Sequence, residues 1–429
     1  MSREMKHSGI DWIGEIPKEW DLKRLQSQVV EIKEKNSPIK TNFILSLTIK
    51  DGVIPYEEKG DVGNISKDNH EEYKLAYPDT IVLNSMNILI GAVGICKYFG
   101  CVSPVYYVFK NAETSDLHFL NYILSSPPFQ KYLRKFANGI LEIRLRISSS
   151  DILKQSIPLP SLSEQQKIAS YLDKVCGEVD EMIALQEQMI EELKAYKQSV
   201  ITEAVTKGLN PDVPMKDSGI DWIGEIPEHW FVERKLSHIC NKGISYGIVK
   251  LFDPDDINGV KVLRCSDVLE GYISEEKIRT VSKDLSQEYK RTILRGGEIV
   301  INVRGTLGGC AVVPCSMRGY NIAREVALVD TREINNYYLM YFFLSNAFHN
   351  YQKRYLAGCI YLGLNIEMLS ACSVIMPPMN EQQSIASYLD TKCAEIDALI
   401  SIKQAKIEEL KEYKKSVIYE YVTGKKEVV

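Results

Sequence analysis

Two long stretches of the chain place apolar residues at alternating steps of three and four, which is the spacing of a helical seam. The first seam comprises Ile168, Leu172, Val175, Val179, Met182, Met189, Leu193, Tyr196 and Val200, with Gln186 as its interruption. The second, looser seam comprises Ile385, Leu389, Ile396, Leu399, Ile400, Ile407, Leu410 and Val417. Each stretch of ~40 residues predicts a helix of ~60 Å.

Start and stop signals bound both predicted helices. Ser163 and Asn380 are predicted N-caps, because their side chains can accept a hydrogen bond from a first-turn N–H. Gly208 and Gly424 stand where glycine ends helices. A long helix with one apolar stripe must pair, and we expect its partner to be the other helix of this chain. A plain packed helix or an intermolecular coiled coil remains an alternative.

A block of mixed pattern precedes each helix, at residues 21–157 and 231–374. Short β-type runs are predicted at 43–54, 80–86, 103–110, 260–268, 297–305 and 324–330. Apolar helical runs are predicted at 116–126 and 334–346, and basic aromatic helices at 129–139 and 350–358. The chain is therefore predicted to be an α+β protein in which both blocks follow one plan with different residues.

The two halves also share near-identical segments. SGIDWIGEIP occurs at Ser8–Pro17 and again at Ser218–Pro227, followed by Trp20 and Trp230. The starts of the predicted helices match as well, at 161–183 and 379–400. These repeats predict an internal duplication with a pseudo-two-fold relation. We divide the chain into a first domain at 1–157, a helix at 158–208, a second domain at 209–375 and a helix at 376–429.

Composition narrows the function classes. The 429 residues are 45% hydrophobic with a net charge of −5, so binding to nucleic acid by bulk charge is disfavoured and a local groove is not. The start is polar, and the longest apolar stretch, at 80–100, contains asparagine, serine and glycine. We therefore expect strand–turn–strand there rather than a membrane span, and a cytoplasmic protein.

Cysteine usage agrees with a reducing compartment. The ten cysteines show no CxxC spacing, so free thiols are expected. Cys96 and Cys101 in the first half match Cys310 and Cys315 in the second, which suits a hairpin position for small thiols. A metal site with distant partners is the alternative.

No catalytic motif emerges from the sequence. The glycine-rich runs GAVG at 91–94 and RGTLGG at 304–309 lack the GK[ST] of a phosphate-binding loop, and turn glycines explain them. Histidine pairs with metal spacing and a Gly-x-Ser-x-Gly elbow are both missing from the sequence. We therefore expect neither catalytic residues nor a cofactor or metal site in this chain, and binding becomes the leading function class.

Basic residues with interleaved aromatics occur at matching places in both blocks, a pattern typical of DNA binding. In the first block they are Lys131, Arg134, Lys135, Arg144 and Arg146. In the second block they are Lys353 and Arg354, with further cations at Arg291, Arg295, Arg304, Arg318 and Arg324. Any one of them could be an ordinary surface residue, whereas the paired placement favours DNA.

Together these motifs resemble the specificity subunits of type I restriction–modification systems. The resemblance rests on SGIDWIGEIP, on IPLPSLSEQQKIASYLD at 157–173 with IMPPMNEQQSIASYLD at 375–390, and on block segments around 84–109 and 303–329. It implies two target-recognition domains separated by two long antiparallel coiled-coil helices. Each domain would read one half of a bipartite site, with half-site centres about 34 Å apart. Because the blocks differ, the site is expected to be non-palindromic.

The resemblance also implies the partners. These are double-stranded DNA, two adenine methyltransferase subunits and restriction subunits, with no membrane. This chain would be the non-catalytic specificity subunit of a site-specific deoxyribonuclease and adenine-N6 methyltransferase complex. S-adenosylmethionine, ATP and Mg²⁺ would bind the partners, and the methyltransferase would flip the base. The base contacts expected here, from residue type and loop placement, are Asn87, Arg144, Arg146, Arg304, Arg324, Tyr361 and Asn365.

Two other function classes stay open from the sequence. One is a fused methyltransferase or nuclease, which requires a cofactor or metal site that the sequence does not display. The other is a structural coiled-coil adaptor without a DNA role, which leaves the paired basic segments unexplained.

Overall fold

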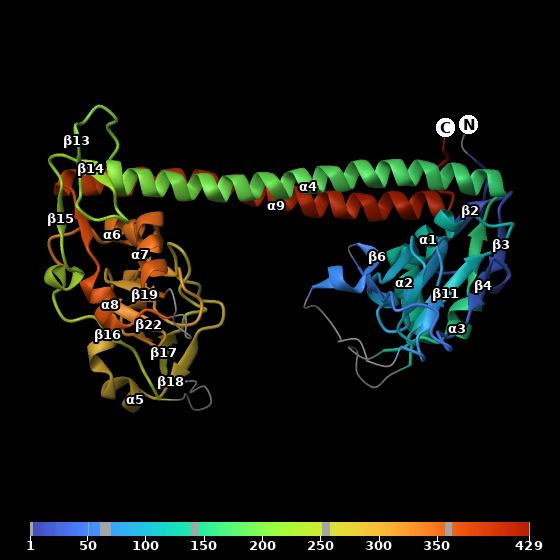
Figure 1. Cartoon of the computed structure of the whole chain (residues 1–429), viewed down its shortest axis with the longest axis horizontal. Helices are drawn as coiled ribbons and strands as arrows, with labels where there is room; N and C mark the ends of the chain where they lie inside the picture. The colour runs from blue at the N-terminus through green and yellow to red at the C-terminus, as the bar shows by residue number, and fades with distance from the viewer. Residues whose placement is uncertain are drawn as a thin grey trace. The chain divides into compact units, whose positions relative to one another are not determined.

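The computed structural model describes residues 3–49, 51–60, 70–138, 145–250, 258–356 and 363–428 (Figure 1). The chain forms two compact units. The first unit contains Met1–Glu187 and Ala405–Val429, and the second contains Gln188–Gln404. Each unit therefore holds one of the two blocks together with a segment of both long helices.

The two long helices are α4, Leu162–Lys207, and α9, Met379–Val422. Both predicted N-caps are wrong. The backbone N–H of Glu164 donates to the hydroxyl of Ser161 at 3.3 Å, so α4 begins two residues before the point that the cap at Ser163 required. The helix α9 already includes Asn380 in its first turn. The preceding prolines permit these earlier starts, because a proline at the helix entrance loses only an N–H that would have no intrahelical partner.

Both predicted helix ends are confirmed. Gly208 follows α4 with φ of 80°, and its N–H donates to the Ala204 carbonyl at 3.1 Å. Gly424 follows α9 with φ of 70°. A left-handed backbone at this position costs glycine little, which is why these residues end the helices.

The seam of α4 differs from the predicted one at alternate positions. Met182 and Tyr196 are about half exposed, at 48% and 51%, and Leu399 on α9 is likewise exposed. The inward positions of α4 keep Val179, Leu193 and Val200 of the predicted seam and add Cys176, Ile183 and Ile190. Those of α9 keep Ile396, Ile400, Ile407, Leu410 and Val417 and add Cys393. Adjacent apolar pairs allow two registers in the sequence, and only packing selects one of them.

The segments of α4 and α9 run antiparallel in each unit. In the first unit Lys414 binds Asp180 at 2.6 Å, and in the second unit Lys197 binds Asp397 at 2.7 Å. These are the same two positions of the repeated helix, exchanged between its copies. The helices therefore meet in the same register in both units.

A four-stranded antiparallel sheet forms the centre of each unit, with strand order β4-β11-β8-β9 in the first and β16-β22-β19-β20 in the second. The first sheet comprises β4 (Val29–Ile32), β8 (Thr80–Asn84), β9 (Val93–Cys96) and β11 (Tyr106–Asn111). The second comprises β16 (Ser245–Tyr246), β19 (Ile299–Asn302), β20 (Cys310–Val312) and β22 (Val326–Val329). The same order with unlike residues confirms the predicted common plan.

Short helices accompany each sheet at corresponding places in the chain. They are α1 (Leu117–Ser125), α2 (Pro127–Leu133) and α3 (Ser149–Leu153) in the first unit, and α6 (Asn336–Leu344), α7 (Asn346–Leu356) and α8 (Ile366–Ala371) in the second. Asp116 caps α1 and Asn335 caps α6, each accepting hydrogen bonds from first-turn N–H groups. The predicted apolar helices are confirmed as α1 and α6, and the second basic helix as α7. The first basic helix is α-helical to Leu133 and 3-10 helical over Arg134–Phe136, after which Asn138 forms a β-bridge with Arg146.

The outer strands distinguish the units. The first unit adds the pairs β5 (Leu45–Thr48) with β6 (Gly52–Pro55) and β7 (Lys74–Ala76) with β10 (Gly100–Val102). The second unit adds a three-stranded sheet of β18 (Arg279–Val281), β17 (Val260–Leu263) and β21 (Asn321–Ile322). The helix α5 (Lys283–Glu288) follows β18 in the chain. The two units therefore have different outer strands around central sheets of the same strand order.

The repeated decapeptide forms a leading hairpin in each unit, together with the residues just before it. The hairpins pair β1 (Met5–His7) with β2 (Glu15–Pro17), and β13 (Met215–Asp217) with β14 (Glu225–Pro227). After each hairpin comes a buried tryptophan. The indole N–H of Trp20 donates to Glu164 at 3.2 Å, and that of Trp230 donates to Glu381 at 2.9 Å. The hairpin is thereby fixed to the start of a long helix in its unit.

Each leading hairpin also packs against the end of the other long helix. Trp20 shares a core with Val422 of α9, whereas Trp230 shares one with Val205 of α4. Next to them lie the strand pairs β3 (Asp21–Arg24) with β12 (Ser156–Leu159) and β15 (Phe231–Glu233) with β23 (Val374–Met376). No helix in the described ranges is long and apolar enough to cross a membrane.

Candidate nucleic-acid interface

In the first unit, two segments far apart in sequence meet where β8 ends. The N–H of Ile147 donates to the carbonyl of Ser85 at 3.1 Å, and the hydroxyl of Tyr107 donates to the carbonyl of Ile147 at the same distance. We name residues 84–87 and 145–147 the loop edge of this unit. The second segment follows residues 139–144, which lie outside the described part of the chain.

The second unit repeats this arrangement at residues 302–305 and 363–365, its own loop edge. The N–H of Leu364 donates to the carbonyl of Val303 at 2.8 Å. The hydroxyl of Tyr246 lies 3.4 Å from the Leu364 carbonyl and accepts from the N–H of Ile366 at 2.9 Å. A tyrosine hydroxyl from the central sheet therefore holds the returning segment in both units, although the two tyrosines come from strands at different places in the sheet.

The loop edges differ in where the arginine stands. Asn84 and Asn302 are the last residues of β8 and β19. When the two sequences are aligned at these asparagines, Met86 corresponds to Arg304. On the opposing segment, Arg146 of the first unit corresponds to Gly363 of the second. Arg304 forms a β-bridge with Gly363, and its guanidinium lies 5.4 Å from the centre of the Tyr246 ring. The two loop edges therefore share a backbone arrangement but carry their arginine on opposite segments, the returning segment in the first unit and the segment after the strand in the second.

The other predicted base-contacting residues fall at these edges with one qualification. Asn87 and Arg146 are exposed at the first edge. The N–H of Arg304 lies 3.2 Å from the Glu325 carbonyl, which brings exposed Arg324 next to the second edge. The side chain of Asn365 caps α8 by accepting from Met368 N–H at 2.7 Å, so its carbonyl oxygen has a structural partner. The predicted contacts Arg144 and Tyr361 lie outside the described residues.

The basic helical residues belong to a second group, beside the leading hairpins. Lys135 binds Asp11 at 2.7 Å, and Arg354 binds Asp221 at 3.3 Å. Asp11 and Asp221 are the same position of the repeated decapeptide. The hydrogen bond and charge of Lys135 lower the pKa of Asp11. These two cations therefore connect their helices to the hairpins, and the exposed side chains of Lys131, Arg134 and Lys353 lie on the same basic segments.

The tyrosines that hold the loop edges could not be predicted from the sequence. Tyr107 lies in a predicted strand, but nothing in its spacing indicates a partner forty residues later. Tyr246 lay outside every predicted element. The period-2 pattern tells which face of a strand a residue occupies, not which carbonyl its hydroxyl meets.

The cysteines are mostly buried. Within the described ranges nine cysteines are free, and among them Cys315 is the exposed one. Burial raises the pKa of both Cys240 and Cys393 to about 11, so these thiols are protonated at neutral pH. The described residues contain no group of three or more histidine, cysteine, aspartate or glutamate side chains placed to hold a metal ion.

Comparison with known proteins explains the duplicated plan. The sequence model described as the type I restriction modification DNA specificity domain matches residues 17–195 and again 227–412. The chain belongs to this family. It is a type I specificity subunit, and each of its units carries one copy of the matched domain.

Two relatives illustrate the range of similarity. The specificity subunit of the type I restriction enzyme MjaVIII from Methanocaldococcus jannaschii is 25% identical, over 96% of this chain and 93% of its own length. The specificity subunit of the type I restriction enzyme EcoBI from Escherichia coli is 29% identical, over 59% of this chain and 54% of its own length. The match to the archaeal relative therefore includes both units.

Solved structures share the fold of this specificity subunit. A chain from a study of complex assembly and conformational transition in a type I R-M system has a TM-score of 0.72 and 15% identity, covering 95% of this chain and 98% of its own. The HsdS subunit from Thermoanaerobacter tengcongensis has a TM-score of 0.51 and 16% identity over the same shares. At such identities the likeness establishes the architecture alone.

Proposed function

We propose that this specificity subunit reads a bipartite, non-palindromic DNA site, one half with each unit. The observation that carries the proposal is the pair of loop edges. Both are held by the same backbone contacts, while their exposed side chains differ, as with Arg146 in the first unit and Arg304 in the second. Arginine and asparagine at base edges specify sequence, so unlike side chains on a like scaffold would read unlike half-sites.

In this proposal the chain itself is non-catalytic and directs partners to the site. Two adenine methyltransferase subunits would dock on it and restriction subunits would join them. S-adenosylmethionine, ATP and Mg²⁺ would be bound by those partners. The residues that we propose to contact DNA are Asn87, Lys131, Arg134, Lys135, Arg144, Arg146, Arg304, Arg324, Lys353, Arg354, Tyr361 and Asn365.

Genome-wide methylation mapping tests this function directly. In a strain that keeps its methyltransferase genes, deletion of this chain is expected to remove one split adenine-methylated motif. If every such motif persists, the proposal is wrong. An adaptor without a DNA role predicts that persistence, and a fused methyltransferase predicts methylation by the purified chain alone.

Two matched substitutions assign the half-sites. Arg146→Ala is expected to relax one half of the motif and Arg304→Ala the other, each by about 1–3 kcal/mol of discrimination at the position read. Leu185→Ala serves as the control, because this side chain is 54% exposed on α4 and belongs to neither loop edge. Relaxation of both halves by either arginine variant would contradict separate reading.

A further inference from the structure

A cavity of about 540 Å³ opens in the second unit, between the entrance to β16, the segment before β19 and the end of β22. Its lining includes four cationic side chains, those of Lys242, Lys290, Arg291 and Arg295, and one carboxylate, that of Asp330. We call it the basic pocket. The sequence shows Arg291 and Arg295 among the cations of the second block, but no pattern in it places them beside Lys242 and Lys290.

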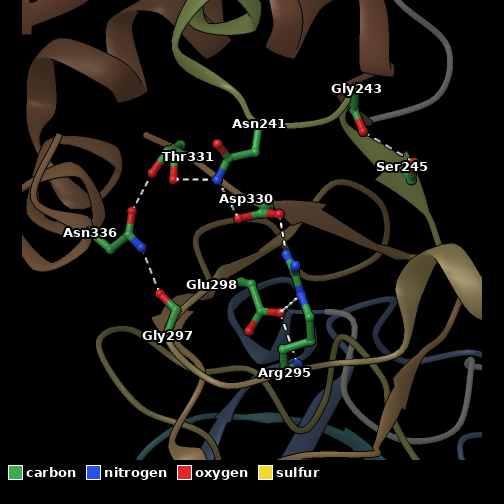
Figure 2. A network of polar contacts seen from close by, with 9 residues as sticks. All are labelled: Asn241, Gly243, Ser245, Arg295, Gly297, Glu298, Asp330, Thr331 and Asn336. Carbon is green, nitrogen blue, oxygen red and sulfur yellow. Dashed lines mark hydrogen bonds and ion pairs between the residues drawn. The ribbon is translucent and has the colours of Figure 1, made fainter. Parts of the chain in front are cut away.

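Arg295 and Asp330 belong to a polar network that stiffens the pocket (Figure 2). Arg295 forms ion pairs with both Glu298, whose side chain is 3% exposed, and Asp330. Asn241 donates to Asp330 at 3.0 Å and to the carbonyl of Thr331 at 2.9 Å. Asn336 of α6 ties the network to the carbonyl of Gly297 at 2.7 Å. Three segments of the chain are thereby held around one cavity.

Arg295 forms ion pairs with two carboxylates, whereas the other three cations of the pocket form none among the described residues. In the described parts of the chain, no carboxylate lies within ion-pair distance of Lys242, Lys290 or Arg291, and all three are exposed. Three like charges gathered at one opening repel one another unless an anion joins them. The pocket therefore carries an excess of positive charge on a rigid base.

The floor of the pocket is apolar. Ile244 and Leu328 are each 7% exposed and line it, together with half-buried Ile293. A cationic rim above an apolar floor suits a ligand with an anionic group on a less polar body, and the volume lies within the range of small-ligand sites. A phosphate ester, with its charge at the rim and its sugar against the floor, has this character.

The first unit lacks the corresponding cation. Asp79 and Gly297 each have positive φ and donate their N–H across the sheet, to Cys96 and Val313, so they mark the same place in the two units. Counting back two residues from each, Arg295 corresponds to Tyr77. The Tyr77 hydroxyl donates to Glu34 at 2.7 Å, which brings a negative charge where the second unit has a positive one. At this position the two units therefore present different side chains, an arginine in the second and a tyrosine bound to a carboxylate in the first.

We propose that the basic pocket binds a phosphate group through Lys242, Lys290 and Arg291, with the attached sugar against Ile244 and Leu328. Two sources share this chemistry, the backbone of bound DNA and a free nucleotide. With DNA as the source, the inference deepens the proposed function and rests on it. With a free nucleotide it stands independently.

The test compares two triple variants of the full chain. K242M/K290M/R291M removes the rim charges and leaves Arg295 in its network. K167M/K174M/K411M removes the same charge from exposed lysines on α4 and α9. Circular dichroism melts confirm that both remain folded. Binding to a duplex that carries the methylated motif is measured over a salt series, and AMP and inorganic phosphate are titrated by calorimetry at constant ionic strength.

Each outcome decides the inference. If DNA supplies the phosphate, the slope of log K against log salt falls by about 1 in the pocket variant, since one phosphate contact contributes about 0.9, and it does not fall in the control. If a free nucleotide is the ligand, AMP binds the natural chain saturably, the pocket variant loses that binding and the slope is unchanged. An unchanged slope without AMP or phosphate binding overturns the inference.

These arms also separate this inference from the proposed function. A chain that binds no duplex under any salt condition refutes the reading of DNA, and the AMP titration then decides the pocket alone. A chain that binds duplex normally after loss of the rim charges retains the proposed function and refutes the DNA form of the inference.

Discussion

The two units of this specificity subunit share their tryptophan contacts and central sheets, and they differ in their outer strands and in the side chains at their loop edges. Trp20 and Trp230 make the same indole–carboxylate contact, and the central sheets have the same strand order. The outer strands, the side on which the loop-edge arginine stands and the charge near Arg295 all differ. Duplication has thus kept the contacts that set the backbone and varied the side chains that the backbone presents.

The difference has a physical basis. A buried contact constrains two residues at once, because a change in one leaves a cavity or an unpaired polar group. An exposed side chain at a loop edge carries no such penalty, so it can vary without loss of fold.

The largest expected effect on stability comes from the two buried tryptophans, and it tests whether they play the same part in their two units. Trp20→Ala and Trp230→Ala should each destabilise their own unit by about 3–5 kcal/mol, because each removes a fully buried indole. Hydrogen exchange followed by mass spectrometry, unit by unit, measures the loss. Ile402→Ala, at a side chain that is 63% exposed, is the control. Equal loss of protection in both units from either tryptophan variant would contradict separate cores.

A smaller and unequal effect is expected at the helix ends. A Cβ at Gly424 would lie 2.5 Å from Cδ of Pro17, whereas one at Gly208 would lie 3.1 Å from the Trp230 ring. Gly424→Ala should therefore cost about 2–3 kcal/mol and Gly208→Ala about 1–2 kcal/mol, including the strain of positive φ.

Gly219→Ala isolates the backbone contribution, since its φ is 69° and no atom lies within 4 Å of the added Cβ. It should cost about 1 kcal/mol. Thermal unfolding of the three variants gives the ranking. Equal costs at Gly424 and Gly219 would show that the contact with Pro17 relaxes freely.

A buried hydroxyl distinguishes the cores. Tyr338 in α6 is fully buried, and its hydroxyl lies 3.2 Å from the carbonyls of both Val205 and Ile375. The first unit has buried Phe119 in α1, two residues into its helix as Tyr338 is into α6. Tyr338→Phe should cost about 0.5–1.5 kcal/mol, because it removes one hydrogen bond. Exposed Tyr337→Phe is the control, and a loss of the same size there would refute the assignment.

The smallest effect concerns the ion pairs between α4 and α9. Double-mutant cycles on Lys197 with Asp397, and on Lys414 with Asp180, should each give a coupling of about 0.2–1 kcal/mol, because all four groups are partly exposed. High salt should remove most of it. A coupling found in one unit but not the other would show that the helix registers are not equivalent.

Much of the fold could be predicted from the sequence where a local signal existed. The repeated decapeptide predicted equivalent starts, the period-2 runs predicted β8, β11, β19 and β22, and the glycines predicted both helix ends. The seam failed at Met182 and Leu399 because neighbouring apolar residues made two registers equally good. The predicted cap at Ser163 failed because Ser161 competes with it over the same first turn.

The candidate interface was predicted in part. Residue type and loop placement pointed to Arg146 and Arg304, and the structure brings both to loop edges. The partner of Lys135, however, is Asp11 of the leading hairpin, which is 124 residues away and has no sequence signal that connects the two. Composition could not separate cations that hold the fold from cations that remain exposed.

The sequence by itself determined the duplication, the two blocks and the family, because repeats and periodicity are properties of a linear order. Only the tertiary structure decided which positions face each other. It brought the hydroxyl of Tyr107 to the carbonyl of Ile147 and the hydroxyl of Tyr246 to the carbonyl of Leu364. It also brought Lys242, Lys290 and Arg295 together around one cavity. Strand order and helix register bring such residues together, and both depend on the burial of whole faces rather than on any local pattern.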